Sequence, residues 1–124
     1  MGTGTPPERV ALITGGGTGI GRATAGKLAG EGFHVVILGR REQPLRETAE
    51  AIGVSATWYP LDVTQREQVA TTVAMVVERW GKIDALVNAA GYAMGVQAAW
   101  RLLALLQEEL EAAGAPLARG ARVA

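Results

Sequence analysis

Five of the seven residues at positions 15–21 are glycines, within the stretch TGGGTGIG at residues 14–21. Glycine loses more backbone freedom on folding than any other residue, so this run indicates conformations or close approaches that only glycine allows. It lies between an apolar run at residues 10–13 and a segment with helical spacing. A glycine-rich turn from a strand into a helix lets backbone N–H groups approach a diphosphate, which the helix dipole also attracts. The spacing T-G-x-x-x-G-x-G therefore predicts dinucleotide binding, and the alternative is a flexible turn.

Two arginines follow the second apolar run, in the order Gly39-Arg40-Arg41. A protein that binds NAD usually carries an acid about 20 residues after the glycines, where it binds the ribose 2′-hydroxyl. The first acid here is Glu42. Because a guanidinium pairs with a phosphate and a carboxylate repels it, Arg40, supported by Arg41, favours NADP over NAD. The alternative is a pair of solvated arginines that open a loop.

The elements that must position these residues alternate along the chain. Apolar runs predict strands at residues 9–13, 33–38, 56–61 and 85–88. Helices are predicted at residues 20–30, around residues 45–52, and from a Thr64–Glu67 capping box to Gly81. In the first helix, Ile20, Ala23 and Leu28 are expected to face the core. Strands that alternate with helices are typical of βαβ units, so a doubly wound α/β domain is predicted at residues 9–124, after a flexible N-terminus at residues 1–8.

The last third of the chain has a different pattern. A long amphipathic helix is predicted at residues 97–113, and its apolar face consists of Ala99, Leu102, Leu103, Leu106 and Leu110. Residues 121–124 are typical of the start of a fifth strand. Because leucines in water would destabilise the domain, we predict a homo-oligomer through this helix, in its simplest form a homodimer. The alternative is a monomer in which the helix folds back onto the sheet.

Composition limits the other classes of function. The 124 residues suffice for one domain, and 48% apolar residues suit a folded protein. Lys+Arg and Asp+Glu are both 12, so no basic field for nucleic acid or acidic lipid is expected. The chain has no cysteine, which excludes disulfides, thiolate metal sites and cysteine nucleophiles and fits a reducing cytosol. With no apolar signal region or spanning run, we predict a cytoplasmic protein without membrane, nucleic-acid or metal partners.

Three motifs resemble those of the short-chain dehydrogenases/reductases. The family signature TGxxxGIG is matched by Thr14, Gly15, Gly19, Ile20 and Gly21. The family aspartate after the third strand is matched by Asp62, and its N-A-G motif after the fourth strand by Asn88-Ala89-Ala90-Gly91. The resemblance is continuous over residues 9–91. It implies a Rossmann-type sheet with strand order 3-2-1-4, followed here by a fifth-strand stub.

The resemblance also implies how the matched residues meet the cofactor. Gly15, Gly19 and Gly21 would contact the pyrophosphate. Asp62 and the Val63 backbone would face the adenine, and the alternative for Asp62 is a cap of the following turn. Thr18 is neutral where some NADP-using members are basic, which leaves NAD open as a cofactor.

The N-A-G motif is given two roles by the same resemblance. Asn88 would tie the fourth strand to its neighbours, and the alternative is an ordinary turn former. Ala89, Ala90 and Gly91 would pass close to the cofactor ribose. Only residues 92–95 then separate the motif from the long helix, a shorter connection than in the family.

The family's proton-transfer residues have no counterpart in this sequence. Members use a Tyr-x-x-x-Lys pair with an upstream serine, which places an acid/base group beside the hydride carrier. Tyr59 and Tyr92 are followed four residues later by Val63 and Val96. His34, inside the second strand, is expected to be packed or exposed rather than catalytic. No catalytic residue is predicted.

Three hypotheses for the function follow. The first is part of an oxidoreductase that, when complete, would transfer hydride between a nicotinamide cofactor and a carbonyl or alcohol. The second is a non-enzymatic dinucleotide-binding module with a regulatory or assembly role. The third is a chain that becomes active only with a partner that supplies the rest of the site.

Overall fold

The computed structural model describes residues 9–89, 96–112 and 114, with α4 side chains described only at positions 101, 104, 105 and 107–112. The elements in chain order are β1 (Arg9–Thr14), α1 (Gly19–Gly30), β2 (Phe33–Gly39), α2 (Glu42–Ile52), β3 (Ala56–Pro60), α3 (Arg66–Trp80), β4 (Ala85–Asn88) and α4 (Val96–Ala112). The predicted flexible N-terminus at residues 1–8, the connection at 92–95 and the strand start at 121–124 lie outside the described residues.

The strands form one parallel sheet in the order β3-β2-β1-β4, which confirms the predicted topology. Thr14, the last residue of β1, lies beside Leu38 of β2 and Asn88 of β4. Because the strands are parallel, their carboxyl ends and the loops that follow them meet at one edge of the sheet.

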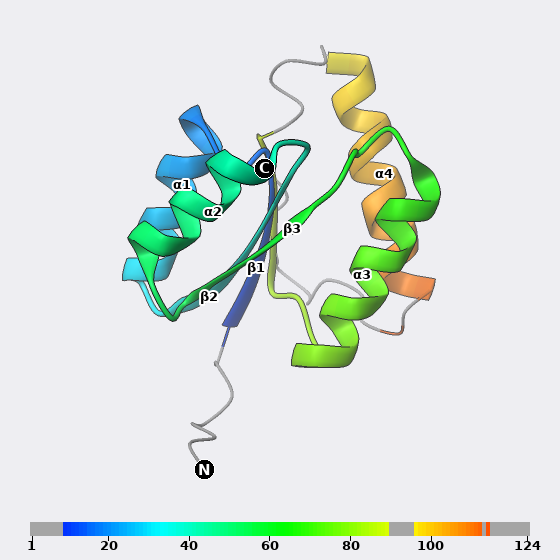
Figure 1. Ribbon diagram of the computed structural model, residues 1–124. Coiled ribbons are helices and arrows are strands. Elements are labelled where there is room, and N and C mark those ends of the chain that lie inside the picture. Colours follow the sequence, from blue (N-terminus) through cyan, green and yellow to red (C-terminus); the bar gives the residue numbers. More distant parts are fainter. Residues whose placement is uncertain (1–8, 90–95, 113, 115–124) are drawn as a thin grey trace.

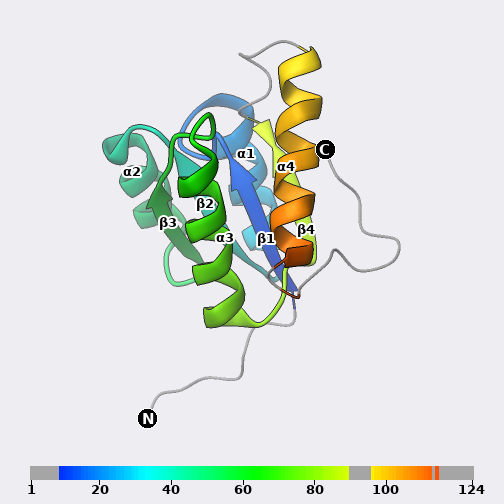
Figure 2. The ribbon, with the colours of Figure 1, turned by 90° about the vertical axis from the view of Figure 1, so that its right-hand side faces the viewer.

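Helices cover both faces of the sheet, with α1 and α2 on one side and α3 and α4 on the other (Figures 1 and 2). Side chains of β1 alternate between two cores, as the period of a strand requires. Val10 and Leu12 pack on the α3 and α4 side, whereas Ala11 and Ile13 pack on the α1 and α2 side. Both faces of β1 and β2 are thus buried, which explains why these strands are continuous apolar runs rather than alternating ones.

Of the three residues predicted to face the core from α1, Leu28 packs against it, whereas the other two do not. Ile20 is 61% exposed and Ala23 is exposed, whereas Gly21 and Ala25 are buried. A Cβ atom at position 21 would overlap the carbonyl oxygen of Gly15. The first turn of the helix therefore packs through its glycine, which turns Ile20 outward.

The start of α3 also corrects the sequence analysis. The residue at the N-cap is Gln65 and makes no side-chain cap hydrogen bond, so the Thr64–Glu67 capping box is wrong. The hydroxyl of Thr64 instead donates to Asp62 Oδ1 at 2.6 Å. The predicted end is confirmed, because Gly81 adopts the left-handed conformation at φ 78°.

The C-terminal half of α4 packs against its own chain. Leu110 is fully buried in the core shared with α3, and Leu105 packs against that core. Arg66 of α3 pairs with Glu108 at 3.2 Å and Glu109 at 3.8 Å. At Leu110 the helix therefore folds back onto the domain, and the side chains of the other four apolar residues in the predicted face lie outside the described part of the chain.

Candidate functional site

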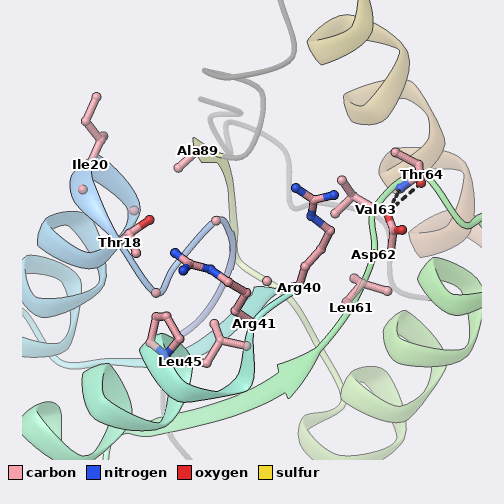
Figure 3. A pocket seen from close by; sticks show the side chains of 16 residues that line it. Thr18, Ile20, Arg40, Arg41, Leu45, Leu61, Asp62, Val63, Thr64 and Ala89 are labelled. Atoms are coloured by element: carbon pink, nitrogen blue, oxygen red, sulfur yellow. Dashed lines mark hydrogen bonds between the residues drawn. The ribbon is translucent and has the colours of Figure 1, made fainter.

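A cleft of about 490 Å³ lies at the carboxyl ends of the strands (Figure 3). Each strand contributes to it through the segment that follows it. The lining residues that the sequence analysis had predicted are Gly15, Thr18, Gly19, Ile20, Gly21, Arg40, Arg41, Asp62, Val63 and Ala89. The cleft therefore brings together residues that are up to 74 positions apart in the chain, from the glycine loop to the end of β4.

The glycine loop between β1 and α1 forms one side of the cleft. Its path is anchored by the Gly16 N–H, which donates to the Leu38 carbonyl oxygen at 3.1 Å. Gly19 adopts φ +53°, a conformation that L side chains rarely adopt, and a Cβ built there would meet nothing within 4 Å. The first turn of α1 carries no acidic residue, and the first amides of any helix lack intrahelical acceptors. Backbone N–H groups and the positive end of the helix dipole thus border the cleft, with no carboxylate in the first turn of α1.

Arg40 and Arg41 follow β2 and line the opposite wall. Figure 3 shows the Arg40 side chain directed toward Val63, and the Arg41 side chain directed toward the glycine-loop side. Neither guanidinium forms an ion pair within 4 Å among the described residues. Two cations therefore border one cleft, and both remain available to an anionic ligand.

Asp62 follows β3 and is held by its own loop. Its Oδ1 accepts hydrogen bonds from the Thr64 hydroxyl at 2.6 Å and the Thr64 N–H at 2.9 Å. These bonds, and to a smaller extent the charge of Arg40, lower the pKa of the Asp62 carboxyl, which stays ionised at neutral pH. The Asp62 N–H in turn donates to Gln68 Oε1 at 3.1 Å. Asp62 thus caps the turn after β3, as the alternative for this residue held, and still lines the cleft.

Asn88 is the last residue of β4 and Ala89 follows it, and the two residues have different roles at the cleft. Asn88 Oδ1 accepts a hydrogen bond from the Thr14 hydroxyl at 2.7 Å, which joins β4 to β1 below the glycine loop. Its side chain is not part of the cleft lining, whereas Ala89 is. The contact of Asn88 with a cofactor stays a prediction, and Ala90 and Gly91 lie outside the described residues.

The cleft also has lining residues that the sequence analysis missed, namely Gly17, Gly39, Pro44, Leu45, Leu61 and Thr64. Leu45 is 1% exposed and belongs to the core between α2 and the sheet, and it also borders the cleft. Gly39 is the last residue of β2, and a Cβ there would lie 3.2 Å from Leu45 Cδ2. A glycine at the end of an apolar run was therefore the available signal for this part of the cleft.

His34 lies away from the cleft, as expected. It accepts or donates one hydrogen bond with the Thr57 hydroxyl at 2.9 Å, and its ring centroid is 4.9 Å from that of Trp80. Burial, and then the charge of Arg79, lowers the pKa of His34. Within the described part of the chain, no group of three or more His, Cys, Asp or Glu residues is placed to hold a metal ion. Nor does any helix described here combine the length and apolarity that crossing a membrane requires.

The sequence profile described as short chain dehydrogenase matches residues 9–110. The chain belongs to this family. The match covers the sheet, the glycine loop and most of α4, so the short-chain dehydrogenase fold accounts for every element that borders the cleft. The doubly wound parallel sheet is thus a property of the family that this chain shares.

Among curated members of the family, the short-chain reductase protein NovJ of Streptomyces niveus is 47% identical over 87 residues, which are 68% of this chain and 33% of that protein. The 3-hydroxyacyl-CoA dehydrogenase type-2 of Bos taurus is 39% identical over 85 residues, 68% of this chain and 33% of that protein. The chain therefore spans about a third of the length of these relatives.

Two solved structures of reductases share the fold with a bound cofactor. A variant of actinorhodin polyketide ketoreductase, solved with NADPH, superposes with a TM-score of 0.73 at 33% identity, over 86% of this chain and 48% of that one. The 3-ketoacyl-(acyl-carrier-protein) reductase of Brucella melitensis, solved with NADH, gives 0.72 at 26% identity, over 86% and 50%. The two neighbours hold different dinucleotides, so the fold alone does not select between NADP and NAD.

Proposed function

We propose that the chain binds NADP(H) in the cleft and holds the ribose 2′-phosphate with Arg40 and Arg41. The observation that carries this proposal is the presence of two guanidinium groups where an NAD-binding protein usually has an acid. A phosphate dianion beside these groups would gain charge-assisted hydrogen bonds, which are stronger than neutral ones. NAD, which lacks that phosphate, would keep the other contacts and bind more weakly.

The remaining cleft residues suit the other parts of a dinucleotide. The pyrophosphate would lie on the glycine loop, against Gly15 and the segment from Thr18 to Gly21. Support comes from the open space over Gly19 and from the absence of an acid in the first turn of α1. The missing Cβ atoms at Gly15, Gly19 and Gly21 are what a close approach of phosphate to backbone N–H groups requires.

The adenine would lie beside the segment that follows β3, and a cofactor ribose would lie beside the segment that follows β4, at the other edge of the sheet. The ionised carboxylate of Asp62 would accept from the exocyclic amine of adenine, beside the Val63 backbone. Among the described residues, only Oδ1 of Asp62 is used in hydrogen bonds, which leaves Oδ2 as an acceptor. The segment from Asn88 through Ala89 and Ala90 to Gly91 would pass the ribose.

We further propose that this chain by itself does not turn the cofactor over. A bound nicotinamide supplies or accepts a hydride, and a protein acid/base group must then move the proton. Tyr59 has no lysine four residues later, and its hydroxyl lies beside Arg79 at 3.4 Å on the edge strand, outside the cleft. Tyr92 is followed by valine at the same spacing.

One experiment tests these proposals together. NADPH and NADH are titrated by calorimetry, and the reduced-nicotinamide absorbance is followed with a panel of ketones and aldehydes. Binding without consumption is expected. Consumption that Gly19→Val abolishes would contradict the inactivity, and activity that appears only with an added second chain would favour the hypothesis of a partner that completes the site.

A further inference from the structure

Thr48 is a buried hydroxyl on α2 that reaches the glycine loop. The residue is 1% exposed, and its Oγ1 lies 3.2 Å from the Gly17 carbonyl oxygen and 2.8 Å from the Pro44 carbonyl oxygen. A hydroxyl has one proton to donate, so it is shared between its own helix and the loop. The bond to Gly17 is the one hydrogen bond that joins α2 to the glycine loop among the described residues.

Steric contact reinforces the same junction. A Cβ atom at position 17 would lie 3.0 Å from Pro44 Cβ and 3.1 Å from the Leu45 backbone nitrogen. The loop therefore rests against the first turn of α2 with no room for a side chain. A small displacement of α2 would separate it from the loop.

The first turn of α2 also directly follows Arg40 and Arg41, the two arginines that line the cleft opposite the glycine loop. Arg41 occupies the N-cap position of α2, and Pro44 and Leu45 line the cleft just after it. The junction at Thr48 thus sets the separation between the Arg41 backbone and the glycine loop. The affinity of a ligand that contacts only the glycine loop does not depend on this separation. The affinity of a ligand that contacts both the glycine loop and Arg41 does.

We infer that Thr48 is a positioning residue for dinucleotide selection, which holds Arg41 at the distance from the glycine loop that a 2′-phosphorylated ligand spans. This inference rests on the proposed binding of NADP(H). In NADPH one ribose carries both the pyrophosphate and the 2′-phosphate. The pyrophosphate can therefore contact the glycine loop while the 2′-phosphate contacts Arg41 only when Arg41 and the loop are correctly spaced. NADH has no 2′-phosphate and depends on the loop and the adenine side.

The test compares dissociation constants for NADPH and NADH by calorimetry in Thr48→Val, Thr48→Ser and Thr72→Val. Valine has nearly the shape of threonine but cannot donate, and serine keeps the hydroxyl. Thr72 is a matched control because it is a buried threonine on α3 that does not line the cleft. Thr48→Val is expected to weaken NADPH about tenfold and NADH less than about threefold, on the scale of one lost buried hydrogen bond. Thr48→Ser and Thr72→Val are expected to keep the parent ratio.

A double-mutant cycle separates positioning from simple destabilisation. In an Arg41→Gln background, Thr48→Val is expected to leave the NADPH-to-NADH ratio unchanged, because the guanidinium that the Thr48 junction positions is no longer there. If Thr48→Val does not fold, Gly17→Ala carries the test, since its methyl group presses on Pro44 and is expected to lower the same ratio.

The outcomes distinguish the two levels of the proposal. Equal loss of both dinucleotides, or an unchanged ratio in Thr48→Val or Gly17→Ala, would overturn the role of Thr48 while leaving the proposed binding intact. A fall in the NADPH-to-NADH affinity ratio in Thr72→Val, as in Thr48→Val, would also overturn the role of Thr48. A parent chain that binds neither dinucleotide would overturn the proposed function and this inference together.

Discussion

Replacing Arg40 by aspartate is expected to reverse the dinucleotide preference. Arg40 lines the cleft, is exposed, and has no ion-pair partner among the described residues, so the phosphate would be its main partner. A hydrogen bond to a charged group contributes about 1.5–3 kcal/mol, and solvent screening at an exposed site reduces this to about 1–2 kcal/mol. Since 1.4 kcal/mol is a factor of ten, NADPH should bind about 5–30-fold more weakly.

The same substitution acts differently on NADH. An aspartate at the end of β2 would repel a 2′-phosphate but accept a hydrogen bond from a ribose 2′-hydroxyl. NADH affinity is therefore expected to hold or to rise. Calorimetric titration of both dinucleotides at two salt concentrations measures this, because screening should weaken only the charge-dependent part.

Arg46→Asp is the matched control for the charge change. Arg46 is an exposed residue of α2 that does not line the cleft, so the variant alters the net charge by the same amount elsewhere. An Arg40→Asp protein that still prefers NADPH, or an Arg46→Asp protein that loses the preference equally, would refute the assignment of the 2′-phosphate to Arg40.

Thr64→Val is expected to raise the pKa of Asp62 toward its ordinary value of 3.8, because it removes the hydroxyl that lowers that pKa most; carboxyl-carbon NMR measures it. Lowering the pH below 6.5 is expected to reduce the free energy of unfolding in part through His34, whose pKa is lowered by burial and then by Arg79. The neutral imidazole stabilises the folded state fully above pH 6.5, and this contribution is lost as the pH falls through the lowered pKa. Urea titrations over a pH series should show this loss, and His34→Gln should remove it. For the proposed homodimer through residues 97–113, light scattering at tens of micromolar is expected to give a smaller mass for Leu103→Glu than for the parent chain.

Each of these expectations has a result that contradicts it. If the pKa of Asp62 is unchanged in Thr64→Val, the Thr64 hydroxyl is not the cause of the lowered pKa. An unfolding free energy whose pH dependence is the same in His34→Gln would assign that dependence to other groups. A parent chain that is a monomer, and whose mass and melting are unaltered in Leu103→Glu, would favour the folded-back helix over the homodimer.

The sheet and the glycine loop could be predicted because local physics dominates there. Strands buried on both faces must be apolar throughout, and a loop that packs against its own helix must lack a Cβ at Gly21. Both features can be read from short stretches of sequence, the apolar run of each strand and the glycines at positions 15 and 21. The order of the strands, by contrast, came from the family resemblance, since residues 9–13 alone do not specify their neighbours.

The wrong or missed predictions are of two kinds. Either a residue could form two different local structures, or its partner is distant in the chain. Thr64 is compatible with a helix cap, but its hydroxyl donates to the Asp62 carboxylate at 2.6 Å, so it closes the turn after β3 instead of forming the capping box. Ile20 has helical spacing with Leu28, yet the approach of Gly21 to the loop decides the rotation of α1. The contact of Thr48 with Gly17 joins residues 31 positions apart, and no periodic pattern in either segment specifies it.

The measurement that tests the central claim most directly is a pair of calorimetric titrations of the unaltered chain, with NADPH and with NADH, at the same moderate salt concentration. The account predicts that both bind and that NADPH binds more tightly by about 1–2 kcal/mol, the contribution of one charge-assisted contact at an exposed site. Equal affinities, or a preference for NADH, would contradict the assignment of Arg40 and Arg41 to a 2′-phosphate.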